Sequence, residues 1–127
     1  MNRPIEPKGI APPVANYVHA VLSESPQRIL HTSGVVPVRR DGSVPDDIAE
    51  QAVVVWDNIQ AMLREADLDV DDIVSVTTYA VVGEQLGPIM AARDNALRGH
   101  LAASTLVTVP ALAQPAWRME IAVVAVS

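Results

Sequence analysis

The chain has 127 residues, half of them hydrophobic, a net charge of −6 and no cysteine. This length predicts a single domain, residues 1–127, and the lack of cysteine excludes disulfides and thiolate metal sites. The acidic charge argues against nucleic-acid binding, and no apolar run reaches the roughly 20 residues of a membrane span. A cytoplasmic protein that contacts neither nucleic acid nor membrane is therefore expected.

The first third of the chain predicts an extended arm followed by strands. Met1–Pro13 holds four prolines and predicts an arm or loop, and Asn16–Leu22 predicts a short strand. Ile29–Val38 is a second β-like run, in which Gly34 indicates a bulge or a close approach of another group to the backbone. Arg39–Pro45 is rich in turn residues and separates this run from a helix.

The clearest helix is predicted over Asp46–Asp67. Asp47 followed by Glu50 resembles a capping box at its start. Apolar residues then recur at steps of three and four, as a buried helix face requires: Ile48, Ala52, Val55, Ile59, Met62 and Ala66. A helix with one apolar face needs a sheet to lie on.

The second half predicts a strand, a helix and two strands. Ile73–Val82 is dense in β-branched residues, and Pro88 suits the first turn of a helix that runs to about Gly99. Leu106–Leu112 and Trp117–Val126 are predicted as the last strands. The order β-β-α-β-α-β-β predicts an α+β two-layer sandwich, with one mixed sheet and two helices on one face. Oligomerisation is expected to hide the other face.

No metal or cofactor site is predicted. The three histidines, His19, His31 and His100, lack the spacing of a ligand set, and a zinc site needs three or four convergent ligands. The chain also has no glycine-rich phosphate loop and no Gly-x-Ser-x-Gly elbow.

Glu120 is the strongest candidate for chemistry, because it is a lone acid in an otherwise apolar strand. Alternation along the strand places Arg118 and Glu120 on one face. The carboxylate is either exposed at the strand end and paired with Arg118, or held in a polar pocket. A carboxylate that is buried without partners has a raised pKa and can act as a general acid or base.

The aromatic residues are few and have open roles. Tyr79 is predicted to lie in the core or an interface, whereas Tyr17 follows the proline-rich arm and its hydroxyl could reach a pocket. Trp56 and Trp117 are expected to pack, with one of them marking a subunit contact.

The sequence resembles the RidA/YjgF family over about Asn16 to Val126. The segments that carry the resemblance are Ile29–Pro37, Asp41–Gln51, Asn58–Ile59 with Leu63, Ala103–Val109 and Met119–Ile121. The resemblance implies a chorismate-mutase-like fold and a homotrimer with small-molecule pockets at its subunit interfaces. The best-known members hydrolyse reactive imines and enamines, such as 2-aminoacrylate. Older labels in the family are endoribonuclease L-PSP and translation inhibitor.

The resemblance also implies a set of pocket residues. Glu120 matches the glutamate thought to position or activate water, Tyr17 the pocket tyrosine, and Gly34 the glycine whose backbone faces the ligand. Ser104, Thr105 and Leu106 are expected to complete the ligand site from the late strand.

The late strand departs from the imine-hydrolysing members. They carry an arginine that binds the substrate carboxylate, whereas this chain has Ser104 at that position, or Ala103 after a one-residue shift. Neither can replace a guanidinium. The sequence therefore resembles an arginine-lacking subgroup, with Arg118 as a conceivable substitute cation.

We expect a trimer that acts on or binds a small metabolite, with Glu120 as its catalytic group, but that does not deaminate 2-imino acids. A non-catalytic metabolite-binding or regulatory trimer is the first alternative. An imine or enamine deaminase with an altered substrate is the second. A ribonuclease is disfavoured by the acidic charge.

Overall fold

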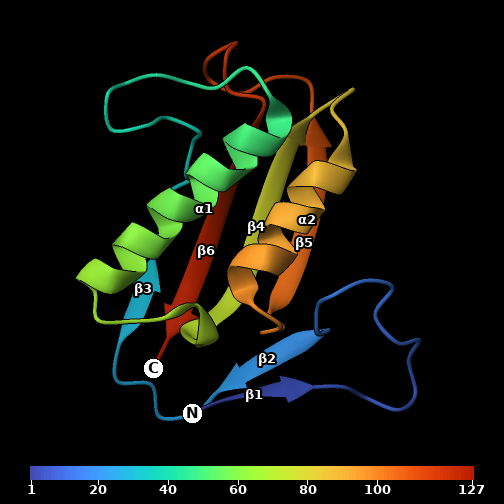
Figure 1. Ribbon diagram of the computed structural model, residues 1–127. Coiled ribbons are helices and arrows are strands. Elements are labelled where there is room, and N and C mark those ends of the chain that lie inside the picture. The colour runs from blue at the N-terminus through green and yellow to red at the C-terminus, as the bar shows by residue number, and fades with distance from the viewer.

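A computed structural model describes all residues, 1–127, and shows two helices on one face of a four-stranded sheet (Figure 1). The spatial order of the strands is β3 (Ile29–His31), β6 (Met119–Val126), β4 (Ile73–Val81) and β5 (Ala103–Val109). β6 is antiparallel to both of its neighbours, whereas β4 and β5 are parallel. A parallel pair needs a long crossover, which α2 (Leu86–Leu97) supplies. The predicted α+β fold with a mixed sheet and two helices is confirmed.

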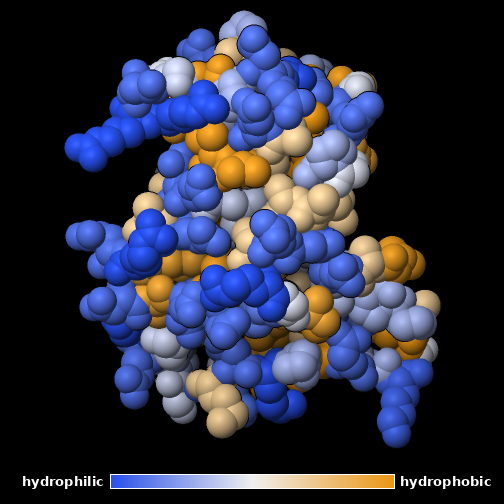
Figure 2. Space-filling model, in the orientation of Figure 1, coloured by the Kyte–Doolittle hydropathy of each residue, from blue (hydrophilic) through white to orange (hydrophobic).

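The N-terminal region differs from the prediction. β1 (Asn2–Ile5) and β2 (Ala20–Ser23) form a separate antiparallel hairpin, so the prediction of a single sheet was wrong, and the first part of the predicted Met1–Pro13 arm or loop is a strand. The long connection between these strands projects from the body of the molecule (Figures 1 and 2) and carries Ile10 and Val14, both exposed. These two strands are separated by a long connection, so no pattern among neighbouring residues predicts that they pair.

α1 (Ile48–Glu65) begins where the capping pattern predicted. The Asp47 carboxylate accepts a hydrogen bond from the Glu50 N–H at 3.2 Å, which satisfies one of the free donors of the first turn. The predicted apolar face is buried as far as Ile59. Met62 is instead 41% exposed, and the buried row continues through Leu63.

Two boundaries in the second half were shifted. α2 begins at Leu86, two residues before Pro88. β5 covers 103–109 in place of the predicted 106–112, because Pro110 has no N–H to continue the ladder. A short 3₁₀ turn, η1 (Val70–Asp72), precedes β4. Hydrogen bonds from the Val70 N–H and Arg98 lower the pKa of Asp69 at its start.

The two sides of the sheet are unequal. Toward the helices, β6 places four residues that are at most 2% exposed: Met119, Ile121, Val123 and Ala125. Glu120, Ala122 and Val124 alternate with them and are half-buried. They belong to what we call the open face, the side of β4, β5 and β6 that carries Thr77, Thr105 and Glu120. No helix packs on the open face (Figure 1). Neither helix of the chain is long and apolar enough to cross a bilayer.

Candidate functional site

Glu120 and Gly34 form the core of the candidate site. The segment after β3 is held beside β6 by two hydrogen bonds between Val35 and Ile121, at 2.7 and 3.1 Å. A Cβ built on Gly34 would overlap Oε2 of Glu120 and lie 2.9 Å from its Cδ. Only glycine allows the carboxylate to lie so close to the backbone. The close approach that the sequence predicted at Gly34 is confirmed.

The Glu120 carboxylate has no hydrogen-bond or ion-pair partner within the chain, and the Gly34 N–H has none either. The two carboxylate oxygens, which are acceptors, and a free N–H donor therefore lie next to each other on the surface of the chain. Carboxylates and backbone N–H groups left in this way bind water or a ligand.

Arg118 does not supply a cation to this site. Its Nη1 lies 2.8 Å from both carboxylate oxygens of Glu84, its Nη2 donates to the Asp46 carbonyl, and its backbone N–H donates to Gln51. The Arg118–Glu120 pair, one of the two alternatives that the sequence left open for the carboxylate, is therefore not formed. The guanidinium is turned toward the start of α1, where two carboxylate oxygens and a carbonyl satisfy it.

Tyr79 is the neighbour of Glu120 across the open face. It lies directly opposite Glu120 in the β4–β6 register and opposite Val107 in the β4–β5 register. Tyr79 is half-buried, so it belongs to the open face and not to the core between sheet and helices.

The three predicted residues of β5 lie on different faces. Thr105 pairs with Thr77 on the open face and is exposed. Ser104 and Leu106 point toward α2, because Ser104 Oγ accepts a hydrogen bond from Arg93 Nη1 at 3.3 Å and successive strand residues alternate. The structure therefore brings only Thr105 to the open face.

Arg93 is a buried arginine that the sequence pattern did not single out. Its side chain is 5% exposed, and its Nε and Nη2 donate to Oδ1 of Asp94 at 3.1 and 3.0 Å. Together with Ser104, these partners use most of its donors beneath α2. The sequence did contain a sign that Arg93 is buried, since Arg93 stands four residues after Ile89 and three before Ala96, within the apolar row of α2.

Tyr17 lies at the opposite edge of the sheet from Gly34. The Val18 N–H donates to the Ala102 carbonyl at 3.1 Å, and Val18 bridges to Ala103, which places Tyr17 beyond β5. Gly34 follows β3, at the other end of the strand order. A single chain therefore does not bring the predicted pocket tyrosine to Glu120.

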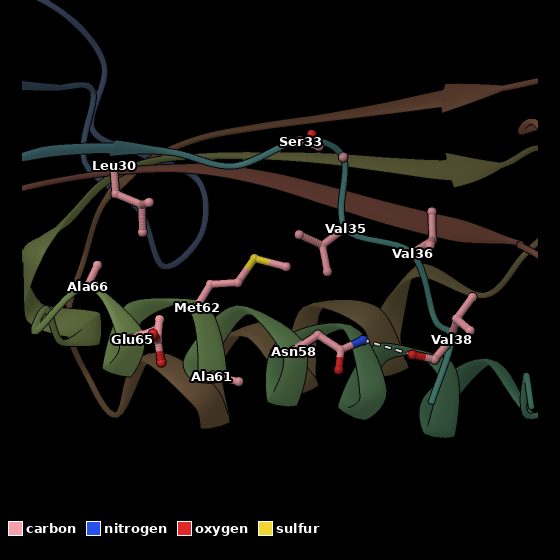
Figure 3. Close-up of a pocket in the computed structure, with 11 residues that line it drawn as sticks. Leu30, Ser33, Val35, Val36, Val38, Asn58, Ala61, Met62, Glu65 and Ala66 are labelled. Atoms are coloured by element: carbon pink, nitrogen blue, oxygen red, sulfur yellow. Dashed lines mark hydrogen bonds between the residues drawn. The ribbon is translucent and has the colours of Figure 1, made fainter. Parts of the chain in front are cut away.

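The largest cavity is a groove of about 690 Å³ between α1 and residues 30–38 (Figure 3). We call it the α1 groove. Gly34 lines one end of it, but Glu120 does not. No cluster of three or more histidine, aspartate or glutamate side chains is arranged to hold a metal ion.

Comparison with known proteins places this geometry in context. A family model described as Endoribonuclease L-PSP matches residues 9–127. The crystal structure of a protein of unknown function of the conserved Rid protein family, YyfB from Yersinia pestis, is 30% identical, with a TM-score of 0.89 over 99% of this chain and 98% of that one. The YjgF gene product of Escherichia coli is 27% identical, with a TM-score of 0.73 over 98% of both chains.

A curated relative matches over a shorter stretch. The 2-iminobutanoate/2-iminopropanoate deaminase of Escherichia coli (strain K12) is 45% identical over 49 residues, which cover 38% of this chain and 38% of that protein. The chain thus matches well under half the length of this curated relative.

Proposed function

Because this chain belongs to the Endoribonuclease L-PSP family, with Rid and YjgF proteins among its relatives, we propose that Glu120 is the acid–base group of a small-molecule site. Its ligand is an imine or enamine that carries no carboxylate. The observation that carries this proposal is the unpaired Glu120 carboxylate above Gly34, on a sheet face without lysine or arginine.

The charge of the open face supports the choice of ligand. Strands β3 to β6 place no lysine or arginine on it. Two arginines that border the sheet, Arg93 and Arg118, are bound by Asp94 and Glu84. The deaminase relative is named for 2-imino acids, whose carboxylate would be repelled by Glu120 in the absence of a cation. An uncharged or protonated imine meets no such repulsion.

The proposed reaction turns a protonated imine and water into a ketone and ammonium. Glu120 accepts a proton from water as the water oxygen bonds to the imine carbon, and the C=N π electrons move to nitrogen. Glu120 then returns that proton to nitrogen. The C–N bond breaks, and the hydroxyl proton passes to the departing ammonia. A positioned base of this kind contributes roughly 10²- to 10⁴-fold in rate.

We propose that a homotrimer completes the site. Tyr17 lies beyond β5, whereas Gly34 lies at the β3 edge. Contact between the β5 edge of one copy and the β3 edge of the next would join them. Head-to-tail contacts form a ring when the rotation between copies closes, and a ring of three with the open faces turned inward would also cover those faces.

A matched pair of substrates tests the proposal. Propan-2-imine and 2-iminopropanoate differ only by a methyl group in place of a carboxylate, and both can be generated in situ by amine and amino-acid oxidases. We expect the protein to accelerate hydrolysis of propan-2-imine alone, and Glu120→Gln to reduce that acceleration at least about 100-fold. Glu24→Gln, a change at an exposed carboxylate of the hairpin, is the control.

Two outcomes would contradict this function. Acceleration of 2-iminopropanoate would show that a cation reaches the site after all. Binding of imine analogues without turnover, abolished by Glu120→Gln, would favour the non-catalytic alternative. Sedimentation of the same preparation should give about three times the 13.6 kDa chain mass, and a monomer would leave Tyr17 outside the site.

A further inference from the structure

The α1 groove is a second concave site, which shares Gly34 with the candidate site but is not lined by Glu120. One wall is a row on α1 formed by Asn58, Met62 and Glu65, and the other comes from Leu30 and Val36 (Figure 3). The groove follows α1 from residue 58 to residue 66, about 12 Å at the helical rise of 1.5 Å per residue. Its volume of about 690 Å³ lies within the range of small-molecule sites.

The lining of the groove is mainly apolar and is open to solvent. Met62 is 41% exposed, although its row adjoins the buried row of α1. Methionine is flexible and polarisable, so it adapts to ligands of varied shape. An exposed methionine between two apolar walls provides a contact surface for an apolar ligand body.

The polar groups of the groove are mainly acceptors. Asn58 Nδ2 donates to the Val38 carbonyl at 3.0 Å, which leaves Asn58 Oδ1 free. The Glu65 carboxylate has no ion pair. No lysine or arginine lines the groove, and near its two ends Arg28 contacts the end of α1 and Arg39 pairs with Glu50. The free charge of the groove is therefore negative.

We propose that the α1 groove binds a small molecule with an apolar body and a protonated amine. The amine pairs with Glu65, and the apolar body lies against Met62, Leu30 and Val36. Charge complementarity favours this class of ligand, because the lining offers acceptors and a carboxylate within a chain of net charge −6. A carboxylate-bearing ligand of the same shape finds no cation there.

The experiment uses 2-phenylethylamine, with 2-phenylethanol and phenylacetate as uncharged and anionic analogues. Binding is followed through the methionine methyl resonances, because Met62 lines the groove whereas Met119 is fully buried. We expect a saturable shift of the Met62 methyl resonance, with an affinity that decreases from the amine to the alcohol to the carboxylate. The Met119 methyl should not shift.

Variants separate the charge from the groove. Glu65→Gln should weaken binding of the amine about threefold, as for an exposed ion pair, and leave the alcohol unchanged. Asp57→Asn, the neighbouring carboxylate of α1 that does not line the groove, should change neither. Glu120→Gln should also change neither, so failure of the Glu120 proposal and failure of this one are distinguishable.

Three results would overturn the inference. The first is a Met62 methyl that does not respond to the amine at millimolar concentration. The second is phenylacetate binding as tightly as the amine. The third is a Met62 shift that follows protein concentration and not ligand, which would show that a second copy of the chain occupies the groove.

Discussion

The two faces of the sheet differ although the same strands form both. Toward the helices, β6 presents Ile121 and its neighbours, which are at most 2% exposed. Toward the other side it presents Glu120, Ala122 and Val124, all half-buried. The first face is closed by the chain itself, whereas the second remains available for a ligand or for another copy.

The difference between the two faces also explains why Arg93 does not contribute to the candidate site. Arg93 meets Ser104 on the covered face, where it is enclosed by α2 and paired with Asp94. Thr105, the next residue of β5, is exposed on the open face. A position's contribution to the site therefore depends on the face it occupies, and one step along a strand reverses that face.

The largest expected effect is on the covered face. Ile121→Ala should reduce the free energy of unfolding by about 2–5 kcal/mol, because it opens a cavity in a fully buried position. Val124→Ala, on the open face of the same strand, should reduce it by less than about 1.5 kcal/mol. Urea unfolding measures both. Equal losses at high protein concentration that diverge on dilution would show that assembly buries Val124.

The next effect comes from adding an arginine on either side of β5. Ser104→Arg should destabilise the fold by about 1–3 kcal/mol, because it crowds the space under α2 and faces the Arg93 guanidinium. Thr105→Arg should change stability by less than about 0.5 kcal/mol, since its side chain is exposed. Thr105→Arg should also strengthen binding of pyruvate, the stable keto analogue of 2-iminopropanoate, at least about threefold. Thermal melts and pyruvate titration distinguish the two variants. A stable Ser104→Arg protein that binds pyruvate, with a destabilised Thr105→Arg protein, would mean that the two faces of β5 were wrongly assigned.

At Gly34 a small effect on stability is expected together with a loss of activity. Gly34→Ala forces the Glu120 carboxylate to move, but that carboxylate is the flexible end of a side chain, so the unfolding free energy should change by less than about 1 kcal/mol. Activity toward propan-2-imine should nevertheless be lost. Gly87→Ala, where a Cβ meets nothing within 4 Å, should leave activity intact and stabilise α2 by about 0.5–1 kcal/mol. Retained activity in Gly34→Ala would argue against the close approach being functional.

Local patterns predicted much of the fold. Three features depend only on neighbours in sequence and could be predicted without the structure: the capping residue Asp47, the apolar period of α1 and the alternation of β6. The Gly34 close approach was legible too, because a glycine inside a β-like run often marks a bulge or a place where another group meets the backbone. The pairing of Asn2–Ile5 with β2 could not be predicted, since the two strands are separated by a long connection.

The candidate site was predicted less completely. Glu120 was identified by its contrast with an apolar strand, and its partner Gly34 by resemblance. The orientation of Ser104 was missed because it depends on which side of β5 faces α2, and the strand start was displaced by three residues. The pairing of Arg118 with Glu84 depends on the conformation of the turn after β4, which the sequence pattern did not predict.

The sequence by itself determined the α+β class, the main helix and the isolation of one acid in an apolar strand, because periodicity and composition are local properties. Tertiary structure decided which face of the sheet each residue of β5 occupies, which carboxylate binds each arginine, and where the α1 groove opens. Those features depend on side chains that meet across distant segments, and their positions are set only when the helices close one face of the sheet.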